Sequence, residues 1–224
     1  MKLDIILTVY NIEKDYLSEC LESIYSQTFQ DFRIIVIDDC STNDYSYLKN
    51  MDKIHYIRNE ENIGMCKSVN KAFSIVNSEY CVRLGSDDKF NSSLLCRESS
   101  FLDYHDDYIA VCCEFQNFGN RNDTISRPKI WNLNLAKKGT DYGFAGGMMF
   151  RSCVLDKIKI DESFPICEDF EFHTQLMKLG KIHAIHEPLY YYRRHENQTV
   201  SKISRDKIKY YQKIIRDRIE NFLN

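Results

Sequence analysis

The sequence lacks the features that would place it outside ordinary globular proteins. No apolar run approaches the roughly 20 residues that a membrane-spanning helix needs. Lysine and arginine number 30 against 33 aspartate and glutamate, so the net charge of −3 does not favour nucleic acid as a partner. No internal repeat or low-complexity segment interrupts the chain. A chain of 224 residues with this composition is long enough to bury a sizeable core as one domain.

The nine cysteines lack the spacing of a metal site or of a disulfide framework. Their number is odd, none forms a C-x-x-C pair, and Cys112 and Cys113 are adjacent. Zinc sites pair their ligands at short spacing, and disulfide frameworks belong to small secreted domains. The apolar run at residues 3–9 ends in Thr-Val-Tyr-Asn, so we interpret it as a strand and not as a signal sequence. We therefore expect free thiols and a cytoplasmic location.

Two common nucleotide-binding motifs are also missing. The first expected strand is followed by Thr-Val-Tyr-Asn-Ile-Glu and not by G-x-G-x-x-G, which disfavours a dinucleotide dehydrogenase. No G-x-x-x-x-G-K-[ST] motif occurs, which excludes a P-loop. A nucleotide would have to be held by other means.

What is present is an alternation of strand and helix patterns over residues 1–90. Apolar runs rich in β-branched residues predict strands at 3–11, 33–39, 53–59 and 80–84, with helices at 14–27 and after Gly64. This alternation predicts βαβ units, and hence an α/β fold with a mostly parallel, Rossmann-like sheet flanked by helices.

Polar residues follow the carboxyl end of each expected strand, where ligands of such sheets bind. Because the ends of parallel strands share one edge, we expect these clusters to converge there: Thr8–Asn11, Asp38–Asp39, Asn59–Gly64 and Gly85–Asp88.

The pattern is looser after residue 90. We expect a helix at 93–104, a strand at 108–116, a mobile loop region at 117–139, a helix at 167–180, one or two strands at 181–195 broken at Pro188, and a basic helix at 201–224. The two glycines of the stretch YGFAGGMMF (142–150) would let the backbone approach a ligand or another strand closely.

Three sets of polar residues carry possible chemistry, and each also has a structural interpretation. Two adjacent carboxylates, Asp87 and Asp88, would suit Mg²⁺ or Mn²⁺ beside a diphosphate, or would only cap the next helix. In the pair Glu168–Asp169, one carboxylate could act as a general base, or both could favour a helix N-terminus. His195 could bind a metal or a phosphate, although a lone histidine is more often structural.

Read in order, these segments resemble the GT-A-fold glycosyltransferases of family 2, an inverting family that uses nucleotide sugars. The similar segments are TVYN (8–11), LESIYSQTFQDFRIIVIDDCSTND (21–44), NIGMCKSVNKA (62–72), GSDD (85–88), GGMMFR (146–151), CEDFEF (167–172) and YRRHENQTVS (192–201). The match is collinear over almost the whole chain.

The resemblance implies a role for particular residues. Asp169 matches the catalytic base, and Asp88 the metal ligand, with His195 in a segment that closes over the diphosphate. The donor-binding positions are Thr8, Tyr10, Asp39, Lys67 and Asp87. One departure concerns the motif Asp-x-Asp-Asp, whose first place is taken by Gly85 in this chain.

The function expected from this resemblance is transfer of a sugar from a UDP-sugar to a hydroxyl of a glycan or lipid-linked acceptor, with Mn²⁺ or Mg²⁺ as cofactor. We expect one glycosyltransferase domain over residues 1–200, with a nucleotide-binding half (1–90) and an acceptor half (91–200). Residues 201–224 would form a basic amphipathic helix that either packs on the domain with a solvated outer face or contacts a membrane surface. The alternative is a catalytically inactive module that binds carbohydrate or a partner protein.

Overall fold

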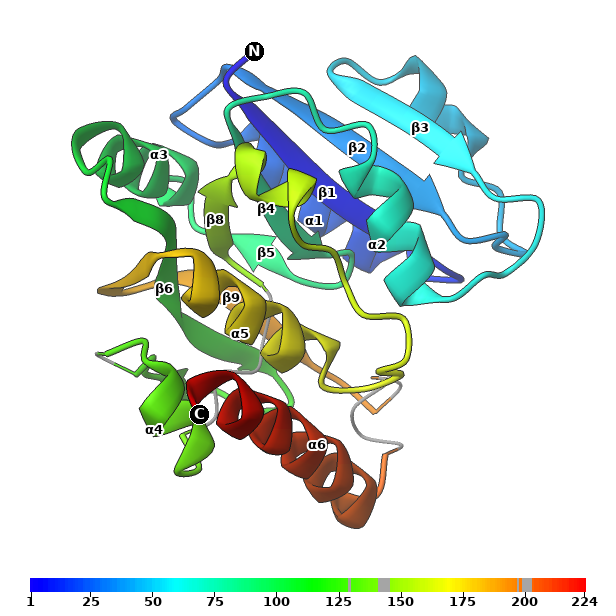
Figure 1. Cartoon of the computed structure of the whole chain (residues 1–224). Coiled ribbons are helices and arrows are strands. Elements are labelled where there is room, and N and C mark those ends of the chain that lie inside the picture. The colour runs from blue at the N-terminus through cyan, green and yellow to red at the C-terminus, as the bar shows by residue number, and fades with distance from the viewer. Residues whose placement is uncertain (129, 141–145, 197, 199–202) are drawn as a thin grey trace.

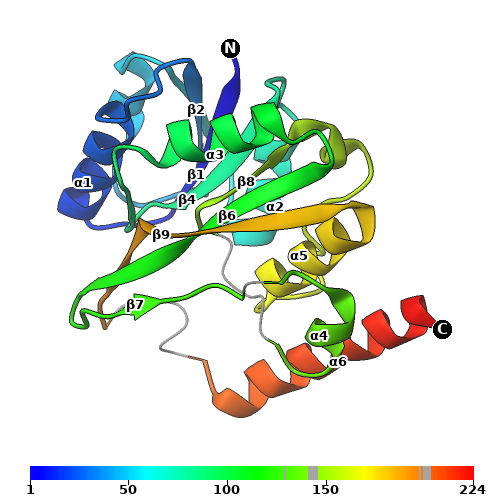
Figure 2. The same ribbon diagram turned by 90° about the vertical axis from the view of Figure 1, so that its left-hand side faces the viewer.

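A computed structural model describes the chain except for residues 129, 141–145, 197 and 199–202 (Figure 1). Its centre is a nine-stranded sheet with the strand order β3-β2-β1-β4-β8-β6-β9-β5, and β7 pairs with β6. Helices flank the sheet on both faces, as Figures 1 and 2 show. The expected α/β fold is confirmed.

The first half of the chain forms the parallel part of the sheet, in which β1 pairs with β2 and β4, and β2 pairs with β3. The observed bounds are close to the expected ones. They are β1 (Leu3–Val9), α1 (Lys14–Tyr25), β2 (Phe32–Asp38), the 3₁₀ helix η1 (Ser46–Asn50), β3 (Ile54–Arg58), α2 (Met65–Phe73), β4 (Tyr80–Gly85) and β5 (Lys89–Phe90).

The second half makes the sheet mixed, because β8 runs antiparallel to both β4 and β6, whereas β6 and β9 are parallel. Its elements are α3 (Leu94–Tyr104), β6 (Tyr108–Gly119), β7 (Thr124–Ile125), α4 (Leu133–Lys137), β8 (Met148–Arg151), the 3₁₀ helix η2 (Ser152–Asp156), α5 (Glu168–Leu179), β9 (Lys181–Arg194) and α6 (Arg205–Leu223).

Two expectations for this half were wrong in detail. Residues 117–139 are not a loop throughout, because β6 continues to Gly119 and the chain then forms β7 and α4. The side chains of Leu133 and Ala136 in α4 are buried against α6, which explains why so short a helix is formed. Pro188 does not end a strand, since β9 continues through it with a shift of register against β6.

Alternation along the strands builds a core on each side of the sheet. In β1, Leu3, Ile5 and Leu7 pack with α1 and α3 on one face, and Ile6 packs with α2 and α5 on the other. Helices α4, α5 and α6, which lie near one another at the lower right of Figure 2, share a third apolar cluster. No described helix has both the length and the apolar character to cross a membrane.

Candidate active site

The carboxyl ends of β1, β2 and β4 meet the first turns of α2 and α5 around a cavity of about 810 Å³. All but one of the residues proposed from the sequence line this cavity: Thr8, Tyr10, Asp39, Asp87, Asp88, Asp169 and His195. The exception is Lys67, which is exposed on α2 outside the cavity. The clusters expected at one edge of the sheet therefore do converge.

Asp39 closes the loop that leads from β3 to α2. Its Oδ1 accepts hydrogen bonds from the side-chain amide of Asn59 (2.8 Å) and the backbone N–H of Ile63 (2.9 Å). Its Oδ2 accepts from the N–H of Gly64 (2.9 Å), whose φ of +86° favours glycine. Asp39 thus shapes the cavity wall as well as facing the cavity.

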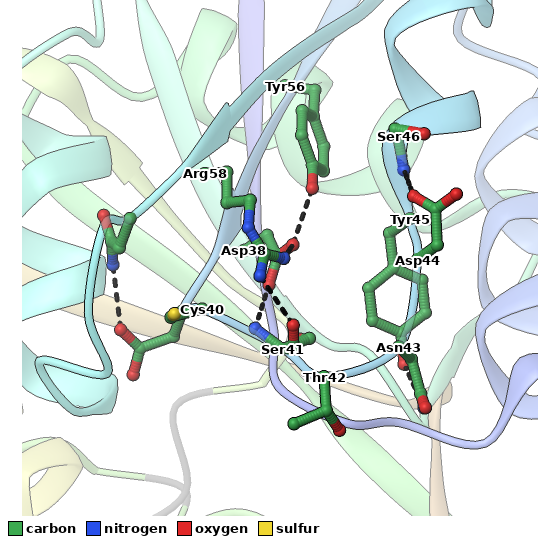
Figure 3. Close-up of polar contacts among 12 residues, drawn as sticks. Asp38, Cys40, Ser41, Thr42, Asn43, Asp44, Tyr45, Ser46, Tyr56 and Arg58 are labelled. Atoms are coloured by element: carbon green, nitrogen blue, oxygen red, sulfur yellow. Dashed lines mark hydrogen bonds and ion pairs between the residues drawn. The ribbon is translucent and has the colours of Figure 1, made fainter.

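The neighbouring Asp38 does not line the cavity, and its side chain is turned to Tyr56 and Arg58 at the end of β3 (Figure 3). The carboxylate is buried and accepts hydrogen bonds from the hydroxyl of Tyr56, the guanidinium of Arg58 and the N–H of Ser41. Burial alone would raise the pKa of Asp38, but these donors outweigh it and lower that pKa below its usual value. Of the two acids after β2, Asp38 is structural and Asp39 faces the cavity.

Asp88 is held by protein groups on both oxygens. The Tyr190 hydroxyl donates to Oδ2 (2.6 Å), and the backbone N–H of Arg193 donates to Oδ1 (2.8 Å). Only 3% of Asp88 is exposed, and burial, then the charge of Asp87, raise its pKa well above the usual value. This carboxylate connects β9 to the turn after β4.

Asp87 is the acid that faces His195, with 3.0 Å between its Oδ2 and the histidine Nε2. The ring of His195 also packs edge-on against Tyr16 of α1, with ring centroids 5.2 Å apart. Arg193 fixes the turn by donating from Nε to the carbonyl oxygen of Asp87 (2.7 Å) and from Nη2 to Glu19 (3.0 Å). The sequence-based prediction named Asp88 and His195 as metal ligands and did not anticipate this contact between His195 and Asp87.

Glycines allow this packing. A Cβ on Gly85 would lie 2.5 Å from Oδ2 of Asp88, so the carboxylate occupies the space that a side chain at position 85 would need. A Cβ on Gly146 or Gly147 would collide with the ring of Tyr190. The glycines of the GGMMF stretch thus serve a close approach between strands, while residues 142–145 lie outside the described part of the chain.

The Glu168–Asp169 pair forms the first turn of α5, after Cys167 in a left-handed conformation (φ 61°). Oδ1 of Asp169 accepts a hydrogen bond from the N–H of Phe170 (2.7 Å). Burial, and next the charge of Asp169, raise the pKa of Glu168 to about 7, while Arg83 opposes the shift. A carboxyl group that titrates near neutrality and lines a cavity is typical of catalytic sites.

The donor set for a divalent metal is small. Within the described residues, no group of three or more His, Cys, Asp or Glu side chains is arranged to hold a metal ion. Asp87 and His195 are adjacent and both line the cavity, so they are two side chains that could hold a metal ion. Mg²⁺ commonly takes only one or two protein carboxylates and completes its shell with water and phosphate oxygens, so this pair fits a metal bound together with a nucleotide.

Sequence reasoning missed Tyr190, Arg193 and Arg83, three residues that shape the cavity. Tyr190 and Arg193 lie in the stretch YYYRRH, where nothing in the spacing distinguishes the tyrosine that reaches Asp88. Arg83 gave a clearer signal, because it interrupts the apolar strand that precedes Gly-Ser-Asp-Asp.

Comparison with known proteins identifies the family. The family model described as "Glycosyl transferase family 2" matches residues 4–156, more than half of the chain. The chain belongs to glycosyl transferase family 2. The match contains both acid pairs of the first half, Asp38–Asp39 and Asp87–Asp88, and ends before Glu168–Asp169.

Individual relatives of this family 2 member are distant. An uncharacterized glycosyltransferase of Haemophilus influenzae is 27% identical over 242 residues, covering 99% of this chain and 74% of the relative. The poly(ribitol-phosphate) beta-N-acetylglucosaminyltransferase TarS of Staphylococcus aureus is 24% identical over 208 residues, covering 86% of this chain and 35% of TarS.

The fold agrees with a solved structure of TarS residues 1–349 in complex with UDP-GlcNAc. The TM-score is 0.77 with 21% identity, covering 91% of this chain and 62% of that one. This likeness supports the GT-A-type fold. The chain therefore spans less than two thirds of the length of that TarS structure.

Proposed function

We propose that this protein is an inverting glycosyltransferase that moves a sugar from a UDP-sugar to a hydroxyl group of a glycan or lipid-linked acceptor. The observation that carries the proposal is one cavity lined by Asp169 and His195 from the second half of the chain and by Asp87 from the first half, with His195 and Asp87 in contact. Its volume of about 810 Å³ lies in the range of small-molecule binding sites.

In this mechanism Asp169 is the general base. An acceptor hydroxyl is a poor nucleophile, and a carboxylate held in hydrogen-bond reach takes its proton as the new bond forms. The acceptor oxygen attacks the anomeric carbon on the side opposite the diphosphate, which inverts the configuration. The sugar ring would lie between the first turn of α5 and the strand ends, with residues 91–200 providing the acceptor half of the domain.

The nucleotide would lie along the ends of β1, β2 and β4. Asp39 lines the cavity and its Oδ2 accepts a hydrogen bond from Gly64, so a uracil N–H would be a second donor to that oxygen. Thr8 lies across from Gly85 on the neighbouring strand. Tyr10, 54% exposed at the cavity, can pack against the base. Lys67 is left out of this proposal, because its exposed side chain does not line the cavity.

Asp87 and His195 would hold Mn²⁺ or Mg²⁺, with Asp88 keeping the turn in place. A divalent ion bound there would neutralise charge on the diphosphate leaving group. Two side chains of β9 hold the acid pair in position: Arg193 donates a hydrogen bond to the carbonyl oxygen of Asp87, and Tyr190 donates one to the carboxylate of Asp88. Such preorganised contacts usually make a large electrostatic contribution to catalysis.

A donor screen tests the proposal. Purified protein is incubated with Mn²⁺ and with UDP-, GDP- or dTDP-sugars in parallel, with and without simple glycan acceptors, and released nucleoside diphosphate is measured. UDP-GlcNAc is the first donor to try, because TarS binds it. Release of UDP from UDP-sugars supports the proposal. Binding of carbohydrate without release of a nucleoside diphosphate from any donor would favour the alternative, a catalytically inactive binding module, which the replacement of the first acid of the motif by Gly85 supports.

A further inference from the structure

Arg83 is a charged residue in the middle of a buried strand. β4 reads Tyr-Cys-Val-Arg-Leu-Gly, and the side chain of Arg83 reaches the cavity. Among the described residues that line the cavity it is the only arginine or lysine. It is set against these carboxylates: Glu13, Asp39, Asp87, Asp88, Glu168 and Asp169. A cation at this position favours the charged form of the carboxylates around it.

The fold itself makes little use of the Arg83 guanidinium. Its Nη2 donates to the sulfur of Met65 (3.4 Å), which is a weak acceptor. Its Nη1 is buried and has no hydrogen-bond partner among the described residues. Buried charges are normally paired or hydrogen-bonded, so a half-buried guanidinium whose Nη1 has no partner is expected to have a negative charge nearby.

The carboxyl group on which Arg83 acts is Glu168, which lines the same cavity. The cavity-lining groups that act on this carboxyl are Asp169, which disfavours its charged form, and Arg83, which favours it. Cys66, which interacts with Glu168, is a neutral thiol, because burial raises its pKa to about 11. Arg83 is therefore the one cation that offsets burial and the charge of Asp169.

We propose that Arg83 is a positioning residue for the Glu168–Asp169 pair, and that its guanidinium favours the ionised form of Glu168 beside the base. The role in catalysis rests on the proposed function, in which Asp169 takes the proton of the acceptor. When two neighbouring carboxyl groups share one proton, neither is fully available as a base. Arg83 reduces that competition by favouring the charged form of Glu168.

A titration that needs no substrate tests the proposal. Protein labelled with ¹³C at the glutamate carboxyl is titrated by NMR, and the Glu168 signal is identified by its loss in Glu168→Gln. In Arg83→Met the midpoint of Glu168 should move up by about one pH unit, because a close opposite charge commonly shifts a carboxyl group by that much or more. Arg83→Lys should restore most of the shift, and Lys157→Met, at an exposed position, should leave it unchanged.

An unchanged midpoint in Arg83→Met would overturn the proposal. Arg83→Gln, which removes the charge and keeps a hydrogen-bonding group, serves as the second variant if Arg83→Met does not fold. Because this experiment uses neither donor nor acceptor, its failure leaves the proposed transfer reaction standing. Likewise, absence of transfer in the donor screen does not affect the titration.

The pH profile of transfer then links the titration to catalysis. In Arg83→Met the acid limb of kcat/KM should move upward with the Glu168 midpoint. In the Glu168→Gln background, adding Arg83→Met should no longer move that limb. A loss of rate that is equal at every pH, or the same movement in both backgrounds, would show that Arg83 acts through something other than Glu168.

Discussion

The Tyr190 hydroxyl donates a 2.6 Å hydrogen bond to Oδ2 of Asp88, a residue 102 positions earlier in the chain. The same hydroxyl accepts a hydrogen bond from the N–H of Gly85 (3.2 Å). One tyrosine on β9 therefore binds both ends of the Gly-Ser-Asp-Asp turn. Its position explains why Asp87, and not Asp88, remains directed at His195.

Metal dependence should follow Asp87 more than Asp88. We expect Mn²⁺ to raise the affinity for UDP, and Asp87→Asn to reduce that effect at least tenfold because it removes one of two protein ligands. Asp88→Asn should keep most of the Mn²⁺ effect, but should lower the free energy of unfolding by about 1–3 kcal/mol, since one buried donor loses its acceptor. Calorimetry of UDP binding with Mn²⁺ and with EDTA measures the first effect, and chemical denaturation the second.

The opposite result for the two variants would assign the metal to Asp88. Specifically, the assignment to Asp87 is wrong if Asp88→Asn abolishes the Mn²⁺ effect in a folded protein while Asp87→Asn preserves it. Equal UDP affinity in Mn²⁺ and EDTA for the unmodified protein would remove the metal from the site altogether.

Gly85 should be intolerant of a side chain for as long as Asp88 stays in place. Because a Cβ at position 85 would lie 2.5 Å from Oδ2 of Asp88, we expect Gly85→Ala to destabilise the protein by about 1–3 kcal/mol. In an Asp88→Ala background the space is vacated, and the same substitution should cost little. A double-mutant cycle measured by denaturation gives the coupling; additive costs would argue against this steric account.

The fold of the first half was readable from the sequence because each strand carries its own signal. β1 and β2 are short β-branched runs buried on both faces, and each ends in polar residues, so their bounds were expected to within about two residues. α4 was missed because its five residues give too little periodicity, and it depends on contact with α6.

The candidate site was only partly readable for a related reason. The acids could be found as pairs after strands, but which member of each pair faces the cavity depends on residues far away in the chain. Asp38 is turned to Tyr56 and Arg58, and Asp88 to Tyr190. No local pattern contains those contacts.

Asp169 can be tested as the base with a change that keeps its shape. Asp169→Asn removes the basicity of the side chain and should lower kcat by about 10²-fold or more, the usual contribution of a general base. UDP affinity should stay within a few-fold. Asp106→Asn, at a position whose side chain is 98% exposed, serves as the control for losing one carboxylate. Near-normal turnover in Asp169→Asn would refute the assignment.

Asp38 should contribute stability that depends on pH. Its pKa in the folded state is lowered, so its contribution is present above the usual carboxyl pKa and is lost as the pH falls through the folded value. At pH 7 we expect Asp38→Asn to cost about 1–3 kcal/mol of unfolding free energy, because Tyr56 and Arg58 lose their buried acceptor. The difference in unfolding free energy between Asp38→Asn and the unmodified protein should become smaller below about pH 4.

Denaturation at several pH values checks this prediction. The exposed Asp52, in the loop before β3, gives the control variant Asp52→Asn, which should show no such narrowing. A cost for Asp38→Asn that stays constant down to pH 3 would show that its ionisation is not what stabilises the fold.

Helix α6 should bind an anionic membrane surface through its basic residues and not through its apolar face. The sequence predicted a basic amphipathic helix that could contact a membrane surface. Ile215 and Ile219 on its apolar side are 1% and 0% exposed and pack against α4 and α5. The outward side still carries exposed basic residues: Arg205, Lys207, Lys209 and Lys213. We therefore expect weak, salt-sensitive binding to vesicles that contain an anionic lipid, without insertion of the helix.

Co-sedimentation at low salt with phosphatidylglycerol vesicles measures this binding. Replacing Lys207, Lys209 and Lys213 with Gln should reduce binding at least tenfold, since each basic residue near an anionic surface contributes about 1 kcal/mol. A matched variant with Gln at the exposed Lys157 and Lys159 should bind like the unmodified protein. If neither low salt nor anionic lipid brings the protein to the vesicles, or if the two variants lose binding equally, the basic face of α6 is only a solvated surface.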